Sequence, residues 1–98
     1  MPVRHVVMFT WNDDLPDSHA AEVSAALAEL PHAIPEIASY VFGPDLGIVD
    51  GNFDYAVVAD FDDRDAFVTY RNHPLHQRFI ANHIADKVAA RAAVQFEL

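Results

Sequence analysis

The chain has 98 residues, 52% of them hydrophobic, and it carries fifteen acidic side chains against six basic ones, for a net charge of −9. Because this charge repels phosphate and the few basic residues are scattered, nucleic acid and anionic membrane surfaces are disfavoured as partners. The absence of cysteine excludes disulfides and thiolate chemistry.

The length is that of one domain, covering residues 1–98. A chain of this size buries only about two-thirds of its unfolded surface, yet the sequence is rich in apolar side chains, including seven Phe. Burial against a second copy would accommodate this surplus, so we expect a homodimer. The first residues lack the long apolar run of a signal peptide or a membrane span, which predicts a cytoplasmic protein.

The first half of the chain predicts a strand, a helix and a second strand. Val3–Trp11 is rich in β-branched and aromatic residues on both faces, which is typical of a strand covered on two sides. Asp17 or Ser18 can cap the helix, whose apolar residues recur at steps of three or four, and Pro31 is expected to end it. The second strand is predicted over Ile37–Gly43, before a turn-rich connection.

The next segment, Phe53–Phe61, alternates between two faces and predicts a third strand. Asp62 and Asp63 can cap a short helix that reaches Asn72. The buried side of this helix is predicted to consist of Ala66, Phe67 and Tyr70.

A further helix is predicted after His73, which can cap it, with Pro74 at its first position, where the missing N–H costs nothing. Its apolar side is expected to consist of Leu75, Phe79, Ile80, Ile84 and Val88. The final segment, Arg91–Leu98, alternates and predicts a half-buried last strand whose apolar set is Ala92, Val94, Phe96 and Leu98.

The resulting order, β-α-β-β-α-β, predicts an α+β fold of the ferredoxin-like kind with a four-stranded antiparallel sheet. Its helices would cover one face of the sheet only. The apolar and aromatic residues of the other face indicate that water does not cover it. We expect two copies to pack sheet to sheet and to form a dimeric α+β barrel.

Histidines and tyrosines are the candidates for chemistry. Tyr70 is predicted on the inner side of its helix and His76 in the first turn of the next, so that both can reach one cavity. A helix N-terminus disfavours a protonated imidazole, and a neutral imidazole is what a general base needs. His5 lies on a strand face expected to be buried, where it is either a hydrogen-bonded core residue or a pocket residue.

Other histidines point less clearly to a site. His73 is expected mainly to cap its helix, and His19 and His32 are expected at the surface. The spacing of His73, His76 and His83 is only a weak match to a metal site, so we predict no metal.

Three segments together resemble the stress-responsive A/B barrel (Dabb) family. They are His5 in an opening Val-x-His-Val-Val-x-Phe strand, the strand Phe53–Phe61, and the signature Phe67-x-x-Tyr70-x-x-His73-Pro74-x-His76. The similarity covers nearly the whole chain. It implies the same dimeric barrel.

The family resemblance also implies a possible activity. A characterised plant member, olivetolic acid cyclase, closes a linear polyketide by aldol condensation without a cofactor. Its catalytic tyrosine and histidine match Tyr70 and His76, and its first-strand histidine matches His5. Leu27 and Tyr55 stand where that enzyme has a tyrosine and a histidine, so the reactive pair is retained while the pocket shape differs.

These patterns lead to one main hypothesis and two alternatives. The main hypothesis is a cyclase, isomerase or lyase without a cofactor that acts on a carbonyl-rich small molecule. Tyr70 and His76 would be catalytic, and the substrate would be bound by His5, Phe9, Tyr55 and His73. The alternatives are a stress-related or ligand-binding dimer without turnover and, by analogy of fold alone, a cofactor-independent monooxygenase.

Overall fold

The computed structural model describes residues 1–98 and confirms the predicted order of elements. Its helices and strands are β1 (Val3–Trp11), α1 (His19–Ala33), β2 (Ile37–Pro44), β3 (Tyr55–Phe61), α2 (Arg64–Asn72), α3 (Pro74–Phe79) and β4 (Val88–Glu97). A π-helical turn over Ile80–Ile84 extends α3.

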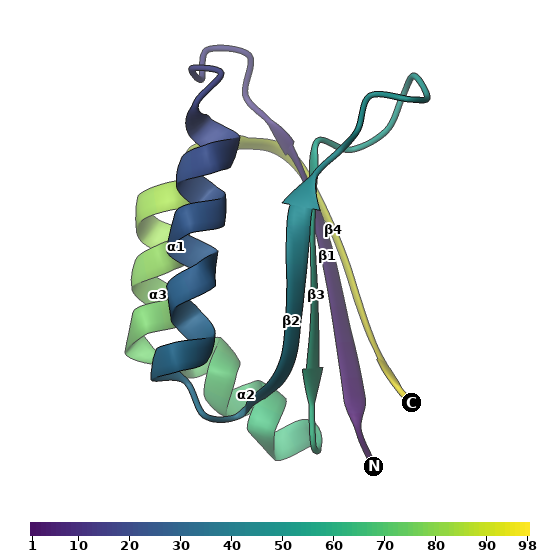
Figure 1. Cartoon of the computed structure of the whole chain (residues 1–98), viewed down its shortest axis with the longest axis vertical. Helices are drawn as coiled ribbons and strands as arrows, with labels where there is room; N and C mark the ends of the chain where they lie inside the picture. Colours follow the sequence, from purple (N-terminus) through teal and green to yellow (C-terminus); the bar gives the residue numbers. More distant parts are fainter.

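The four strands form one antiparallel sheet in the order β2-β3-β1-β4. All three helices lie against the same face of this sheet, and the other face is open (Figure 1). This arrangement confirms the ferredoxin-like α+β fold. None of the helices combines the length and the apolar character needed to cross a membrane.

The helix α1 ends two residues later than the sequence predicts. Pro31 lies inside the last turn of α1, which continues to Ala33. A proline removes one backbone hydrogen bond. The helical hydrogen-bond pattern resumes three residues later, where the Ile34 N–H donates to the Leu30 carbonyl at 2.9 Å. So close to the end of a helix, a proline weakens the last turn without ending it.

The predicted capping residues of α2 and α3 are confirmed. The Asp63 carboxylate accepts a hydrogen bond from the Ala66 N–H at 2.8 Å, and His73 Nδ1 accepts one from the Leu75 N–H at 3.1 Å. Pro74 is the first residue of α3. These two caps fix the break between α2 and α3.

The prediction that Val88 belongs to the last helix is wrong, because Val88 begins β4. The apolar period of three or four residues continues past the point where the backbone leaves the helix. Asp86 has a φ of 66°, a left-handed conformation that a helix cannot contain. The helical segment therefore ends at Ile84.

The core lies between the helices and the covered face of the sheet. Its buried residues are Val7, Phe9, Val23, Leu27, Leu30, Ile34, Tyr55, Val57, Ala59, Phe61, Tyr70, Phe79 and Ile84. His19, predicted at the surface, is buried as well, and its ring packs edge-on against Trp11 with 4.6 Å between the ring centroids. Because His19 lies four residues before Val23, it shares the apolar stripe of α1.

The open face of the sheet carries a row of apolar residues beside the ion pair of Arg4 with Asp60. A row of four valines crosses all four strands in register: Val41, Val58, Val6 and Val94. Val41 at one edge and Val94 at the other are 64% and 53% exposed. In β4 the apolar set of residues thus faces outward, whereas Arg91, Ala93 and Gln95 face the helices.

Candidate functional site

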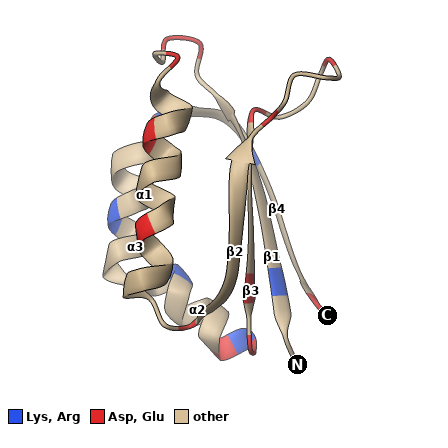
Figure 2. Cartoon of the chain, viewed as in Figure 1, with Lys and Arg blue, Asp and Glu red and all other residues tan.

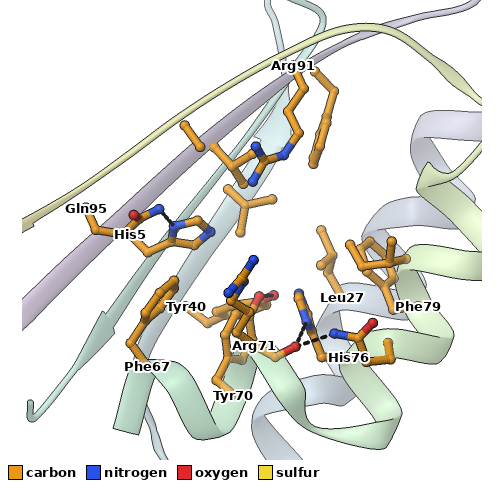
Figure 3. A pocket seen from close by; sticks show the side chains of 16 residues that line it. His5, Leu27, Tyr40, Phe67, Tyr70, Arg71, His76, Phe79, Arg91 and Gln95 are labelled. Carbon is orange, nitrogen blue, oxygen red and sulfur yellow. Dashed lines mark hydrogen bonds between the residues drawn. The ribbon is translucent and has the colours of Figure 1, made fainter. Parts of the chain in front are cut away.

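A cavity of about 620 Å³ lies between the covered face of the sheet and the helices, and sixteen residues line it. Figure 3 shows polar side chains from both layers converging on it. Eight of the lining side chains can form hydrogen bonds or carry a charge: His5, Tyr40, Tyr70, Arg71, His76, Gln77, Arg91 and Gln95.

His5 projects into this cavity from β1. Its Nδ1 lies 2.8 Å from Nε2 of Gln95, the residue beside it in β4. An amide nitrogen donates, so His5 Nδ1 accepts and the proton of the neutral ring is on Nε2. Burial, aided by the charges of Arg91 and His76, lowers the pKa of His5 to about 4. At neutral pH this ring is therefore an uncharged hydrogen-bond donor.

His76 projects into the cavity from the first turn of α3, and it has the opposite tautomer. Its Nδ1 lies 3.1 Å from the Arg71 carbonyl oxygen, which can only accept, so Nδ1 donates and Nε2 keeps a lone pair. Burial lowers the pKa of His76; the Arg71 carbonyl opposes this effect, and the charges of His73 and Arg71 add to it. His76 Nε2 is consequently a base at neutral pH.

Two tyrosines lie beside these histidines, the buried Tyr70 and the half-buried Tyr40. The hydroxyls of Tyr40 and Tyr70 are 2.7 Å apart, and the Tyr70 ring is 4.2 Å from the ring of His76 and 6.4 Å from that of His5, measured between centroids. Burial raises the pKa of Tyr70 to about 12 and also raises the pKa of Tyr40. Both hydroxyls stay protonated at neutral pH and can donate hydrogen bonds.

The four groups together can move a proton and stabilise an oxyanion. His76 Nε2 is the acceptor of a proton, while the Tyr70 hydroxyl and His5 Nε2–H are donors to an oxygen. Apolar side chains, among them Phe9 and Phe67, line the same cavity. The site thus fits a molecule with an apolar part and a carbonyl or hydroxyl oxygen.

Four of the six residues selected from the sequence lie together in this cavity: His5, Phe9, Tyr70 and His76. Tyr55 and His73 do not line it. Tyr55 is 1% exposed, and its hydroxyl is 2.7 Å from the Ser24 hydroxyl in the core. His73 caps α3, as described above.

Sequence reasoning did not select Tyr40, Arg71, Arg91 or Gln95, which also line the cavity. In β4, the polar set of alternating residues faces the helices, the reverse of the usual pattern. Strand pairing could have revealed Gln95, because the antiparallel β1–β4 register places it opposite His5. Tyr40 carries no signal in the sequence, since its position depends on how α2 packs on β2.

No three His, Cys, Asp or Glu side chains come close enough together to hold a metal ion.

Comparison with protein families gives a match to the stress responsive A/B barrel domain (Dabb) over residues 3–98. The chain belongs to this family. The Dabb model spans nearly every residue, including the signature from Phe67 to His76. No curated protein sequence matches the chain.

Solved structures share the Dabb fold of this chain. A dimeric ferredoxin-like protein of unknown function from Thermobifida fusca is 48% identical, with a TM-score of 0.92 over 100% of this chain and 92% of that one. A dimeric protein of unknown function from Bacteroides fragilis is 27% identical, with a TM-score of 0.83 over 99% and 96% of the two chains. The hydroxynitrile lyase of Passiflora edulis is 20% identical, with a TM-score of 0.85 over 99% and 93%.

Proposed function

We propose that this Dabb protein is a cofactor-independent enzyme of the lyase, isomerase or cyclase type that transfers a proton at a carbon next to a carbonyl group. The observation that carries the proposal is the pair of histidine contacts, His76 Nδ1 to the Arg71 carbonyl and His5 Nδ1 to the Gln95 amide, which imply opposite tautomers. His76 offers a lone pair at Nε2, whereas His5 offers an N–H at Nε2, and the two rings share one cavity with the Tyr70 hydroxyl.

The proposed step uses these groups in fixed roles. His76 Nε2 removes a proton from the carbon next to a carbonyl, and the electron pair of the broken C–H bond moves into the carbonyl, which becomes an enolate. The Tyr70 hydroxyl and His5 Nε2–H donate hydrogen bonds to the enolate oxygen. A general base typically contributes about 10²–10⁴-fold to a rate, and a donor to a developing oxyanion about 10²–10³-fold.

The charge states favour this division of roles at neutral pH. Burial lowers the pKa of His76 below the ordinary value of 6.5, so the base is unprotonated and ready. The rate is expected to fall only as the pH drops through this lowered pKa, because protonation then fills the Nε2 lone pair. One structural neighbour, the hydroxynitrile lyase, is a lyase, which is one of the three enzyme types proposed for this protein.

The proposed working form is a homodimer. The row of valines on the open face of the sheet offers a continuous apolar surface to a second copy. The similar proteins from Thermobifida fusca and Bacteroides fragilis are dimeric. Pairing two such sheets would remove both apolar faces from water and form the barrel expected from the sequence.

Solvent exchange at carbon tests the proposed activity. Methyl phenylpyruvate has an acidic CH₂ group beside a ketone, and its replacement of hydrogen by deuterium in D₂O can be followed by proton NMR. The protein is expected to accelerate this exchange above the buffer rate, and His76→Gln is expected to lose about 10²-fold or more of the acceleration. His32→Gln, at an exposed position on α1, is the control and should exchange normally.

Either of two results would contradict the proposal. Full activity in His76→Gln would show that the imidazole is not the base. Binding of the ester without any acceleration by the wild-type protein would indicate a ligand-binding dimer in place of an enzyme.

A further inference from the structure

The cavity has a local charge opposite to that of the whole protein. Among its sixteen lining residues are two arginines, Arg71 and Arg91, and no aspartate or glutamate. The chain has only six basic residues against fifteen acidic ones. Figure 2 shows many of the acidic residues in the loops at the ends of the sheet and on α1, away from the middle of the sheet. Two of the few cations therefore line the one site described above.

The two arginines approach the cavity from opposite layers. Arg91 lies on β4, beside Phe9 of β1, and Arg71 follows Tyr70 in the last turn of α2. Figure 3 shows both guanidinium groups directed toward the interior of the cavity. Arg91 is near enough to His5 to lower the pKa of that imidazole, and Arg71 acts in the same way on His76.

Neither arginine is neutralised within the chain. The ion pairs of the structure join Arg4 to Asp60 and Arg64 to Glu97. Both guanidinium groups line the cavity without an acidic partner and can therefore bind an anion that enters it. Guanidinium presents a planar fork of N–H donors that matches the two oxygens of a carboxylate.

We infer that the natural ligand of this cavity carries a carboxylate, bound by Arg91 and Arg71, next to the carbonyl group on which His76, Tyr70 and His5 act. The substrate class is thus a carbonyl-bearing carboxylic acid, such as a keto acid with an aromatic or alkyl tail. This inference rests on the proposed function for the identity of the reacting carbonyl. The binding of the carboxylate itself depends only on the arginines.

The cavity provides a place for each part of such a molecule. The apolar tail would contact Phe9, Phe67 and Phe79, which line the wall. The carboxylate would lie between the guanidinium groups, and the carbonyl would lie near the imidazoles. Because the protein as a whole repels anions, the local pair of arginines has to supply the selectivity for a negative ligand.

A matched pair of probes tests the inference. Phenylpyruvate and methyl phenylpyruvate share the same ketone and aromatic ring and differ in the charge of one end. Binding of each probe is measured by NMR titration to the wild-type protein, Arg91→Gln, Arg71→Gln and the double variant. Arg78→Gln is the matched control, since Arg78 is an exposed arginine of α3 outside this cavity.

The wild-type protein is expected to prefer phenylpyruvate over its ester. The double variant should bind phenylpyruvate at least about tenfold more weakly and should bind the ester as before. Arg78→Gln should leave both affinities unchanged. Circular dichroism of each variant checks the fold, which should persist because Arg71 and Arg91 are exposed at the cavity rim.

The outcomes separate this inference from the proposed function. Equal affinity for acid and ester, or an equal loss in Arg78→Gln, would overturn the role of the arginines, while accelerated exchange of the ester would still support the enzyme. Arginine-dependent binding of phenylpyruvate without any exchange would uphold the carboxylate site and overturn the catalytic proposal. Failure of the wild-type protein to bind phenylpyruvate would overturn the inference directly.

Discussion

The two faces of the sheet differ most at β4, where polar residues face the helices, although the covered face of the other strands carries the apolar core. The face that the helices cover carries His5, Arg91 and Gln95, whereas the open face carries the valine row that includes Val6 and Val58. His5 is buried, whereas Arg91 and Gln95 are exposed beside the cavity. Val41 and Val94 are exposed on the open face, where apolar surface in contact with water costs free energy. The polar groups around the cavity and the apolar groups on the open face therefore each call for an explanation.

The two faces of the sheet differ in what they are suited to bind. On the covered face, His5 lies 2.8 Å from Gln95 and the hydroxyls of Tyr40 and Tyr70 are 2.7 Å apart, and these side chains line a cavity beside the apolar core. On the open face, the valines lie in register and form a surface suited to a second copy. The covered face carries the candidate site, and the open face carries the proposed dimer surface.

The largest expected effect comes from placing a charge in the valine row. In Val58→Asp, a dimer would bury a carboxylate without a partner, at a cost of several kcal/mol. The dimer dissociation constant is expected to rise at least about hundredfold, which sedimentation velocity can measure. Ala25→Asp adds the same charge at an exposed position of α1 and should leave the dimer intact. A Val58→Asp protein that stays as dimeric as this control would show that the open face is not the interface.

A smaller effect on stability is expected from the loss of either of two tyrosine hydrogen bonds. Tyr40 bonds to Tyr70 in the cavity, and Tyr55 bonds to Ser24 in the core. Replacement of either tyrosine by Phe removes one hydrogen bond, so Tyr40→Phe and Tyr55→Phe should each lose about 1 kcal/mol of the free energy of unfolding.

Only the pair in the cavity is expected to affect the reaction. Tyr40→Phe should slow the exchange of methyl phenylpyruvate by about tenfold, since Tyr70 loses the neighbour that orients its hydroxyl. Tyr55→Phe serves as the matched control. Equal rates in the two variants would place Tyr40 outside the reaction and leave it a structural role alone.

The order of helices and strands could be predicted from the sequence because it depends on patterns among residues close together in the chain. β-Branched and aromatic residues identified β1, alternation identified β3 and β4, and the caps at Asp63 and His73 marked the beginnings of α2 and α3. The family signature identified Tyr70 and His76, and the apolar parity of β1 placed His5 on the covered face. The predicted helix boundaries were wrong in two places. Pro31 lies inside α1 and does not end it, and Val88 belongs to β4 and not to the last helix.

The cavity itself could not be predicted to the same extent. Its wall depends on the pairing of β1 with β4, which directs Arg91 and Gln95 toward the helices, and on the packing of α2 against β2, which brings Tyr40 to Tyr70. These contacts join residues far apart in the chain. The alternation of β4 identifies two sets of residues, but it does not state which set faces the helices.

The proposed roles of His5 and His76 depend on the protonation of their rings, which nitrogen NMR of the imidazoles measures directly in the free protein. At neutral pH we expect both rings to be uncharged, with the proton on Nε2 of His5 and on Nδ1 of His76. As the pH falls, His5 should gain its second proton only near pH 4, and His76 should gain its own below 6.5. A charged His76 at neutral pH, or the same tautomer in both rings, would contradict the assignment of one base and one donor to this cavity.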